Sequence, residues 1–240
     1  MRCFFQKGKY SSMAKKKIQP QTDSLQSVEK ALSKTELFFE ENQKLLIRIV
    51  AVIIVVIAIF VGTKRFYFMP QEKEAQSQMF VAEQYFESDS FNLALYGDGN
   101  YSGFLDIIDQ YKLTKSGNLS KYYAGISFYK LGQYEDAISY LKKFRLNDKM
   151  VAPVAAGAIG DAYVELGELE EGLSYYYKAA DLSENTFTTP MFLLKAGQVH
   201  ESLGDYAGAM KLYERIKKDY PDFSRRRNID KYITRARLNG

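Results

Sequence analysis

The chain has 240 residues, of which 46% are hydrophobic and 26% charged, and its formal net charge is only +4. This balance argues against a nucleic-acid-binding protein, because such proteins need a concentrated basic face to neutralise phosphates. Cys3 is the only cysteine and His200 the only histidine. These counts exclude an intrachain disulfide and any metal site built from several cysteines.

Residues 1–44 are expected to form a cytoplasmic tail. A second methionine, Met13, is followed by Ala14 and three lysines and could serve as the first residue of the protein. Residues 1–12 are therefore interpreted as an over-long start. Cys3 lacks the apolar stretch and small residues that precede a lipid-anchored cysteine. Further along the tail, apolar residues recur near one helical face at Leu25, Val28, Leu32 and Phe39. They predict an amphipathic helix, which either continues into the membrane or lies on the inner leaflet or on a partner.

An uninterrupted apolar run from Ile49 to Gly62, extended across Arg48 to Leu45, predicts a transmembrane helix over residues 45–68. At about 1.5 Å per residue, the part up to Gly62 is about 27 Å long, close to the ~30 Å hydrocarbon core. A buried core helix is the alternative, but such a helix normally keeps a polar stripe. A cleaved signal peptide is disfavoured, because the segment before the run is far longer than the n-region of a signal peptide.

The distribution of basic residues predicts a cytoplasmic N-terminus and a C-terminal domain across the membrane. Within about twenty residues of the span the excess of basic residues is small, and the charges of a long domain count for less. Counted from Met13, the basic residues before the span are Lys15, Lys16, Lys17, Lys30, Lys34, Lys44 and Arg48, and those close behind it are Lys64, Arg65 and Lys73.

Three similar phrases recur in the second half of the chain, "GISFYKLGQYEDA", "GDAYVELGELEEG" and "GQVHESLGDYAGA". Their starting glycines are 35 and 37 residues apart, a spacing typical of helix–turn–helix repeats. The first glycine of each phrase is expected where two helices cross, and the second where a helix ends in a left-handed residue. The positions that define the repeat are Gly125, Gly132, Ala137, Gly160, Gly167, Gly172, Gly197, Gly204, Ala209 and Pro221.

The repeats also share an aromatic position, filled by Phe128, Tyr163 and His200. We therefore interpret His200 as a packing residue and not as a ligand. The pattern has departures. The bulky first-helix position holds Lys121 in the first unit and Ala156 in the second, and matches the expected size only at Leu193 in the third.

This period and these residue types resemble the tetratricopeptide repeat, a 34-residue helix–turn–helix unit. The resemblance implies a tetratricopeptide-repeat α-solenoid. With the N-terminal transmembrane helix predicted above and a C-terminal capping helix indicated by the apolar face of Ile229, Tyr232, Ile233 and Ala236, the expected fold is all-α. The expected boundaries are 1–44 for the tail, 45–68 for the transmembrane helix, 69–117 for a degenerate helical pair, 118–221 for three repeat units (118–152, 153–189 and 190–221), and 222–240 for the capping helix.

The degenerate pair is expected to consist of a helix through Phe80 and Tyr85, a long loop, and a helix through Phe104 and Tyr111. The loop contains "GDGN" at residues 97–100. We interpret it as a turn, because a calcium-binding loop needs further carboxylates at regular spacing.

In such stacks the first helices line a concave groove, which suits a partner helix or an extended segment. The alternative is that the same side chains only pack against the next helix or a capping segment. By the repeat register, the groove positions are Leu119, Tyr122, Ile126, Tyr129, Lys130, Val154, Asp161, Val164, Glu165, Met191, Leu194, Gln198 and Glu201.

No catalytic constellation is visible in the sequence, and the protein is expected not to be an enzyme. The body has no cysteine and no second histidine, and the phosphate-binding glycine motifs are absent. Accordingly we predict no catalytic residues, no cofactor, no metal, no small-molecule substrate and no nucleic acid. An enzyme accessory that binds a small ligand in the groove remains an alternative.

The order of tail, single span and helical repeats, with the terminal "YPDF…YITRARL", resembles the YfgM-type ancillary subunit of the SecYEG translocon, in particular its relatives in the Bacteroidetes. This resemblance implies residence in the bacterial inner membrane, a periplasmic repeat domain, and association with the SecYEG translocon and with the membrane-tethered periplasmic chaperone PpiD. The alternative is another cell-envelope scaffold or assembly factor that is not linked to the translocon.

Overall fold

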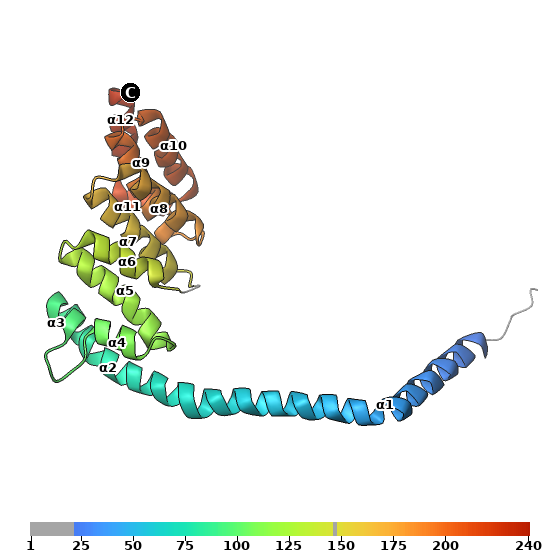
Figure 1. Ribbon diagram of the computed structural model, residues 1–240. Helices are drawn as coiled ribbons and strands as arrows, with labels where there is room; N and C mark the ends of the chain where they lie inside the picture. Colours follow the sequence, from blue (N-terminus) through green and yellow to red (C-terminus); the bar gives the residue numbers. More distant parts are fainter. Residues whose placement is uncertain (1–21, 146–147) are drawn as a thin grey trace, which may run out of the picture. The chain divides into compact units, whose positions relative to one another are not determined.

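The computed structural model describes residues 22–145 and 148–240, with side chains from residue 42 onward, and every regular element in these ranges is helical (Figure 1). It divides into two units, residues 1–61 and 62–240, which we describe separately. The predictions for residues 1–21 and for the side chains of the amphipathic segment lie outside the described residues.

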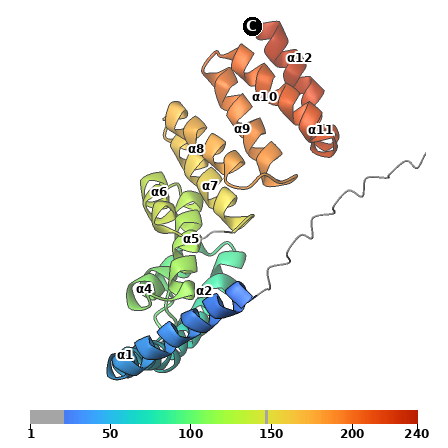
Figure 2. The ribbon, with the colours of Figure 1, turned by 90° about the vertical axis from the view of Figure 1, so that its right-hand side faces the viewer.

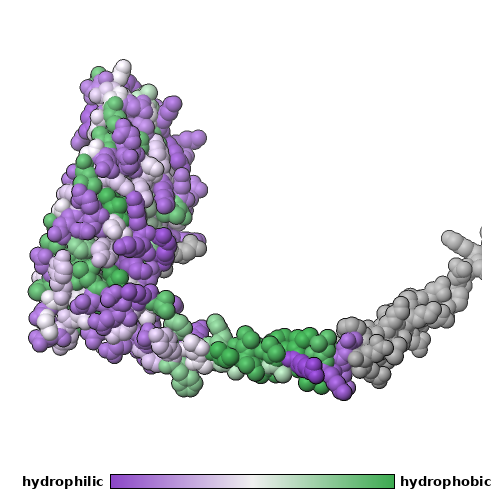
Figure 3. All heavy atoms as spheres, in the orientation of Figure 1, coloured by the Kyte–Doolittle hydropathy of each residue, from purple (hydrophilic) through white to green (hydrophobic). Residues whose placement is uncertain are grey.

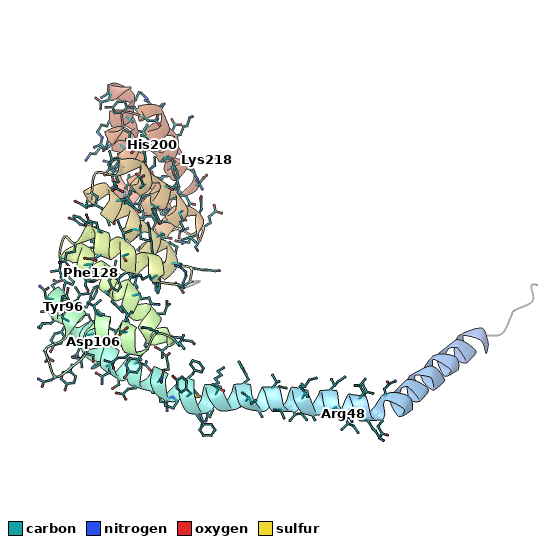
Figure 4. All side chains as sticks on the ribbon, viewed as in Figure 1. Arg48, Tyr96, Asp106, Phe128, His200 and Lys218 are labelled. Atoms are coloured by element: carbon teal, nitrogen blue, oxygen red, sulfur yellow. The ribbon has the colours of Figure 1, made fainter. Side chains whose placement is uncertain are left out.

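The first unit contains most of α1 (Thr22–Thr63), and in its described part, from residue 42 onward, the apolar side chains face outward on all sides. The consecutive residues Val52, Ile53, Ile54 and Val55 are each more than half exposed, although consecutive positions of a helix point in different directions. Figure 3 shows this run as a continuous green band, and Figure 4 labels Arg48 near its start. Within the described residues, one helical run, Asn42–Glu87, is long and apolar enough to span a membrane.

The second unit begins with a short π-helix η1 (Lys64–Phe68), followed by α2 (Met69–Glu87), α3 (Phe91–Tyr96) and α4 (Phe104–Gln110). The expected long loop after α2 is wrong in part, because α3 occupies its first half. Ala94 and Leu95 of α3 are fully buried against α2 and α5 (Lys115–Lys130). Burial of these two side chains supplies the stabilisation that a six-residue helix cannot provide by itself.

A carboxylate of α2 caps the start of α5. The Glu72 side chain accepts hydrogen bonds from the backbone N–H groups of Lys115 and Ser116 at 2.6 and 3.1 Å, and from the Ser116 hydroxyl at 2.8 Å. The Thr114 hydroxyl accepts a further bond from the N–H of Gly117 at 2.9 Å. Together these acceptors satisfy N–H groups that have no partner within the helix.

Three helical hairpins follow, each joined by a tight turn that contains a left-handed glycine (Figure 2). The φ angles of Gly132, Gly167 and Gly204 are +75°, +80° and +79°, a conformation that glycine adopts without a steric penalty. The hairpins are α5 with α6 (Tyr134–Lys143), α7 (Val151–Glu165) with α8 (Leu169–Asp181), and α9 (Thr188–Ser202) with α10 (Tyr206–Asp219).

The two helices of a hairpin approach most closely at a glycine of the first helix. A Cβ atom added at Gly197 would lie 2.3 Å from the Tyr213 ring, and one at Gly125 would lie 2.5 Å from Leu141. Both contacts are far shorter than a van der Waals separation. In all three hairpins the contacted residue lies sixteen positions further along the chain, so the crossing geometry repeats.

Buried side chains form three clusters along the stack. One lies between α2, α3, α4 and the first hairpin, one between the first and second hairpins, and one runs from the second hairpin to the C-terminus. Each hairpin therefore packs mainly on its neighbours, as in other solenoids.

The C-terminal cap consists of two helices, α11 (Pro221–Arg227) and α12 (Ile229–Asn239), and the prediction of one capping helix is wrong in this respect. Asn228 separates them with a φ angle of +50°, a left-handed conformation that ends α11. Ile229, Ile233 and Ala236 of α12 are buried and belong to the third cluster, with α10 as the main contact of α12.

We predict that Gly197→Ala destabilises the third hairpin. The new methyl group would displace the fully buried Tyr213 ring, a cost of about 1–3 kcal/mol, partly offset by a gain of about 1 kcal/mol in helix propensity. Thermal unfolding followed by circular dichroism should show a lower Tm. Ser202→Ala, which introduces the same residue at an exposed position of α9, should leave the Tm nearly unchanged. Equal Tm values for the two variants would contradict this account of the crossing.

Candidate protein-binding site

Five of the thirteen predicted groove residues surround one open hollow of about 280 Å³ between the first helices, which we call the first-helix hollow. These are Tyr129 of α5, Asp161, Val164 and Glu165 of α7, and Gln198 of α9. The sequence did not indicate the other residues of the lining, which are Leu169, Tyr176, Lys195, Val199 and Ser202.

An ion pair crosses the hollow between α7 and α9. Lys195 Nζ lies 2.6 and 2.7 Å from the two carboxylate oxygens of Asp161, and the Tyr176 hydroxyl donates to the same carboxylate at 2.6 Å. Burial raises the pKa of Tyr176 far above its ordinary value, and the Asp161 charge adds to this shift. The hydroxyl therefore stays protonated and remains a donor.

Exposed polar groups complete the first-helix hollow. Glu165 and Gln198 are exposed at its edge, and Tyr129 is half-buried. The hollow thus offers an apolar wall from Val164 and Val199 beside charged and amide groups. A surface of this kind can accept a peptide segment that carries both apolar and polar side chains.

The other eight predicted groove residues do not line the first-helix hollow. Leu194 is buried, so its predicted groove exposure is wrong. Glu201 is covered by the cap, because Arg235 of α12 lies 2.7 Å from its carboxylate. Four more predicted groove residues are half-buried, pack against the three clusters and do not line the hollow: Leu119, Tyr122, Ile126 and Met191. Lys130 is exposed and Val154 is half-buried, and neither lines the first-helix hollow.

His200 (labelled in Figure 4) lies in α9 between two polar neighbours. Its Nε2 is 2.7 Å from the Tyr177 hydroxyl, and its Nδ1 is 2.8 Å from an oxygen of Asp205. Asp205 also accepts a hydrogen bond from the N–H of Gly208 at the start of α10, and this bond is the main reason for its lowered pKa, with His200 contributing. His200 therefore connects α9 to the second helices α8 and α10.

The "GDGN" segment forms a turn. Asp98 accepts hydrogen bonds from the N–H groups of Asn100 and Tyr101 and from the Tyr85 hydroxyl, so its carboxylate is engaged within the chain. Among the described residues, no group of three or more His, Cys, Asp or Glu side chains could hold a metal ion.

Two tetratricopeptide-repeat family models match the chain, over residues 122–185 and 192–222, so the hairpins in these ranges are similar to tetratricopeptide repeats. These matches include the residues of α5, α7, α8 and α9 that line the first-helix hollow.

A curated protein of Methanocaldococcus jannaschii, the TPR repeat-containing protein MJ1428, is 31% identical over 136 residues. The match covers 55% of this chain and 23% of that protein, so the chain corresponds to about a quarter of its relative.

Two solved structures share the fold. MamA matches with a TM-score of 0.50 and 19% identity over 66% of this chain and 94% of that one. A Podosopora anserina protein with nearly identical TPR-like repeats, described as a kinesin light chain, matches with a TM-score of 0.50 and 12% identity over 70% and 95%. At these identities the similarity establishes the helical-repeat fold alone.

We predict measurable coupling between Asp161 and Lys195. A double-mutant cycle with Asp161→Ala and Lys195→Ala should give a coupling free energy of about 1 kcal/mol, because both side chains are partly withdrawn from water. The exposed pair Lys217–Asp230 is the control and should give less than about 0.5 kcal/mol. Indistinguishable couplings in chemical unfolding experiments would show that the hollow does not strengthen the pair.

Proposed function

We propose that this protein is a single-pass membrane scaffold whose tetratricopeptide repeats bind a protein partner in the first-helix hollow. The observation that carries the proposal is the apolar surface of α1. Ile53, Ile54 and Phe60 are each more than half exposed, and in water such a surface is strongly unfavourable. A lipid bilayer would cover it on all sides, since it has no polar face to present to solvent or to a protein core.

A binding role fits the repeats better than a catalytic one. Asp161, the most enclosed carboxylate of the first-helix hollow, is already engaged with Lys195 and Tyr176. The hollow is open and of mixed polarity, which is suited to contact with a polypeptide. An anchor would hold this surface beside a membrane protein and raise its effective concentration there without further contacts.

We further propose that the chain resides in the bacterial inner membrane with its repeats in the periplasm, and that its partner is the SecYEG translocon or the chaperone PpiD. Support comes from the basic residues that precede the span and from the resemblance in architecture noted above. In this role the protein would assist export of secreted proteins or recruit a chaperone to emerging chains.

The topology is tested with a single cysteine. In a Cys3→Ser background, Asn239→Cys should react with a membrane-impermeant maleimide in spheroplasts of a Gram-negative host. In the same background, Ser24→Cys in the N-terminal tail should react only after the inner membrane has been permeabilised. Protection of position 239 until permeabilisation would reverse the proposed orientation, and recovery of the chain in the soluble fraction would remove the anchor.

The partner is tested by photo-crosslinking from the first-helix hollow. A photoreactive residue at Tyr129 or Gln198 should cross-link to translocon subunits or to PpiD in intact cells. The same probe at Lys218, an exposed position of α10 (labelled in Figure 4), should give little product. Products that contain other envelope proteins would favour a scaffold unconnected with the translocon.

A further inference from the structure

A second, larger hollow of about 520 Å³ is lined by α6, α7 and α8. We call it the second-helix hollow, because α6 and α8 are the second helices of their hairpins. The first half of α7 contributes the floor, with Ala152, Ala155, Ala156 and Ile159. At about 100° per residue these floor positions lie on the opposite side of α7 from Asp161 and Glu165. The two hollows therefore present separate surfaces.

Two positions in the floor of the second-helix hollow hold small side chains in the second repeat and large ones in the third. Ala155 and Ala156 occupy the repeat positions of Phe192 and Leu193, which lie 37 residues later and are 2% and 0% exposed. In the third repeat both large side chains are buried, with the Phe192 ring against Gly157 of α7. In the second repeat the two alanines and Ile159 form an apolar floor beneath the hollow.

Three basic side chains also line the hollow. Lys142 lies in α6, Arg145 lies just after the C-terminal end of α6, and Lys178 lies in α8. Among the residues that line the hollow there is no Asp or Glu, and in the described part of the chain none of the three cations forms an ion pair.

Neighbouring aromatic rings hold two of these cations in place. Lys142 Nζ donates to the Tyr163 hydroxyl at 2.6 Å and lies 5.6 Å from the centre of the Tyr175 ring. Lys178 Nζ lies 5.3 Å from the centre of the same ring. The Tyr163 hydrogen bond raises the pKa of Lys142, so its ammonium group stays charged at neutral pH. Both side chains thus have defined contacts, and within the described residues no carboxylate pairs with them.

We propose that the second-helix hollow binds a polypeptide segment in which one bulky apolar side chain is flanked by acidic residues. The apolar side chain would occupy the floor left open by the alanines, and the carboxylates would pair with Lys142, Arg145 and Lys178. A peptide fits better than an anionic lipid, because the hollow is open to solvent and would leave most of an acyl chain exposed. This site is independent of the first-helix hollow and of the membrane proposal.

The test uses the full chain in a mild nonionic detergent and an array of twelve-residue peptides. Each peptide carries Leu, Phe or Gly at its centre. This central residue is flanked by four residues of one kind, which are acidic (Asp or Glu), basic (Lys) or neutral (Ser). The acidic peptides centred on Leu or Phe should bind most strongly. The strongest binder is then synthesised with a fluorescent label, and its Kd is measured by anisotropy.

Two kinds of variant separate the charges from the floor. Lys142→Glu combined with Lys178→Glu should weaken peptide binding by about tenfold or more. Ala156→Leu should weaken it similarly without a change in charge, since it introduces the residue that fills this space in the third repeat. Ala152→Leu, at a less buried position of the floor, provides the same test with less risk to folding.

Lys143→Glu is the matched control, because Lys143 is exposed on α6 and does not line the hollow. It should leave the Kd within about twofold, and circular dichroism should show that all variants keep their helical content. The proposal is overturned if the array selects neutral or basic peptides, or if Lys143→Glu weakens binding as much as the lining variants. It is also overturned if phosphatidylglycerol vesicles bind through Lys142 and Lys178 while the peptides do not.

Discussion

The close approach of the two helices within each hairpin is the constraint on which the rest of the structure depends. The glycines at 125, 160 and 197 have no side chain at the crossing. Leu141, Tyr176 and Tyr213 therefore pack directly onto the backbone at these positions. With the crossing distance set in this way, the turn glycines close each hairpin after a fixed number of residues. Successive hairpins then stack in one register. Both hollows are spaces that the side chains of neighbouring hairpins leave unfilled.

The hairpins could be predicted from the sequence because their determinants are local and repeated. Glycine spacing and aromatic positions recur with the period of the unit, and each repeat supports the interpretation of the others. Other contacts join residues far apart in the chain and carry no periodic signal. Examples are the capping of α5 by Glu72, which is 43 residues before Lys115, and the pair of Asp161 with Lys195. Helix α3 was missed because its stability comes from burial against other helices.

The two hollows differ in how they relate to the repeat pattern. The first-helix hollow lies where the register predicts a groove, although several expected members are covered by neighbouring hairpins or by the cap. The floor of the second-helix hollow contains a departure from the pattern, the alanines at 155 and 156. That departure was visible in the sequence as a missing bulky residue at Ala156. The sequence alone did not show that this position belongs to a candidate binding site. That could be recognised only from the structure, which places Lys142 of α6 and Lys178 of α8 around the same hollow.

Division of the buried side chains into three clusters has a thermodynamic consequence. Because each cluster is shared only by neighbouring helices, the domain does not have to open as one cooperative body. Helices at one end of the stack can therefore open locally without disrupting the glycine crossings of the other hairpins. Amide hydrogens would then exchange in a gradient along the stack, fastest at the end furthest from α2. A partner bound across two hairpins would stabilise the contact between them and slow this local unfolding.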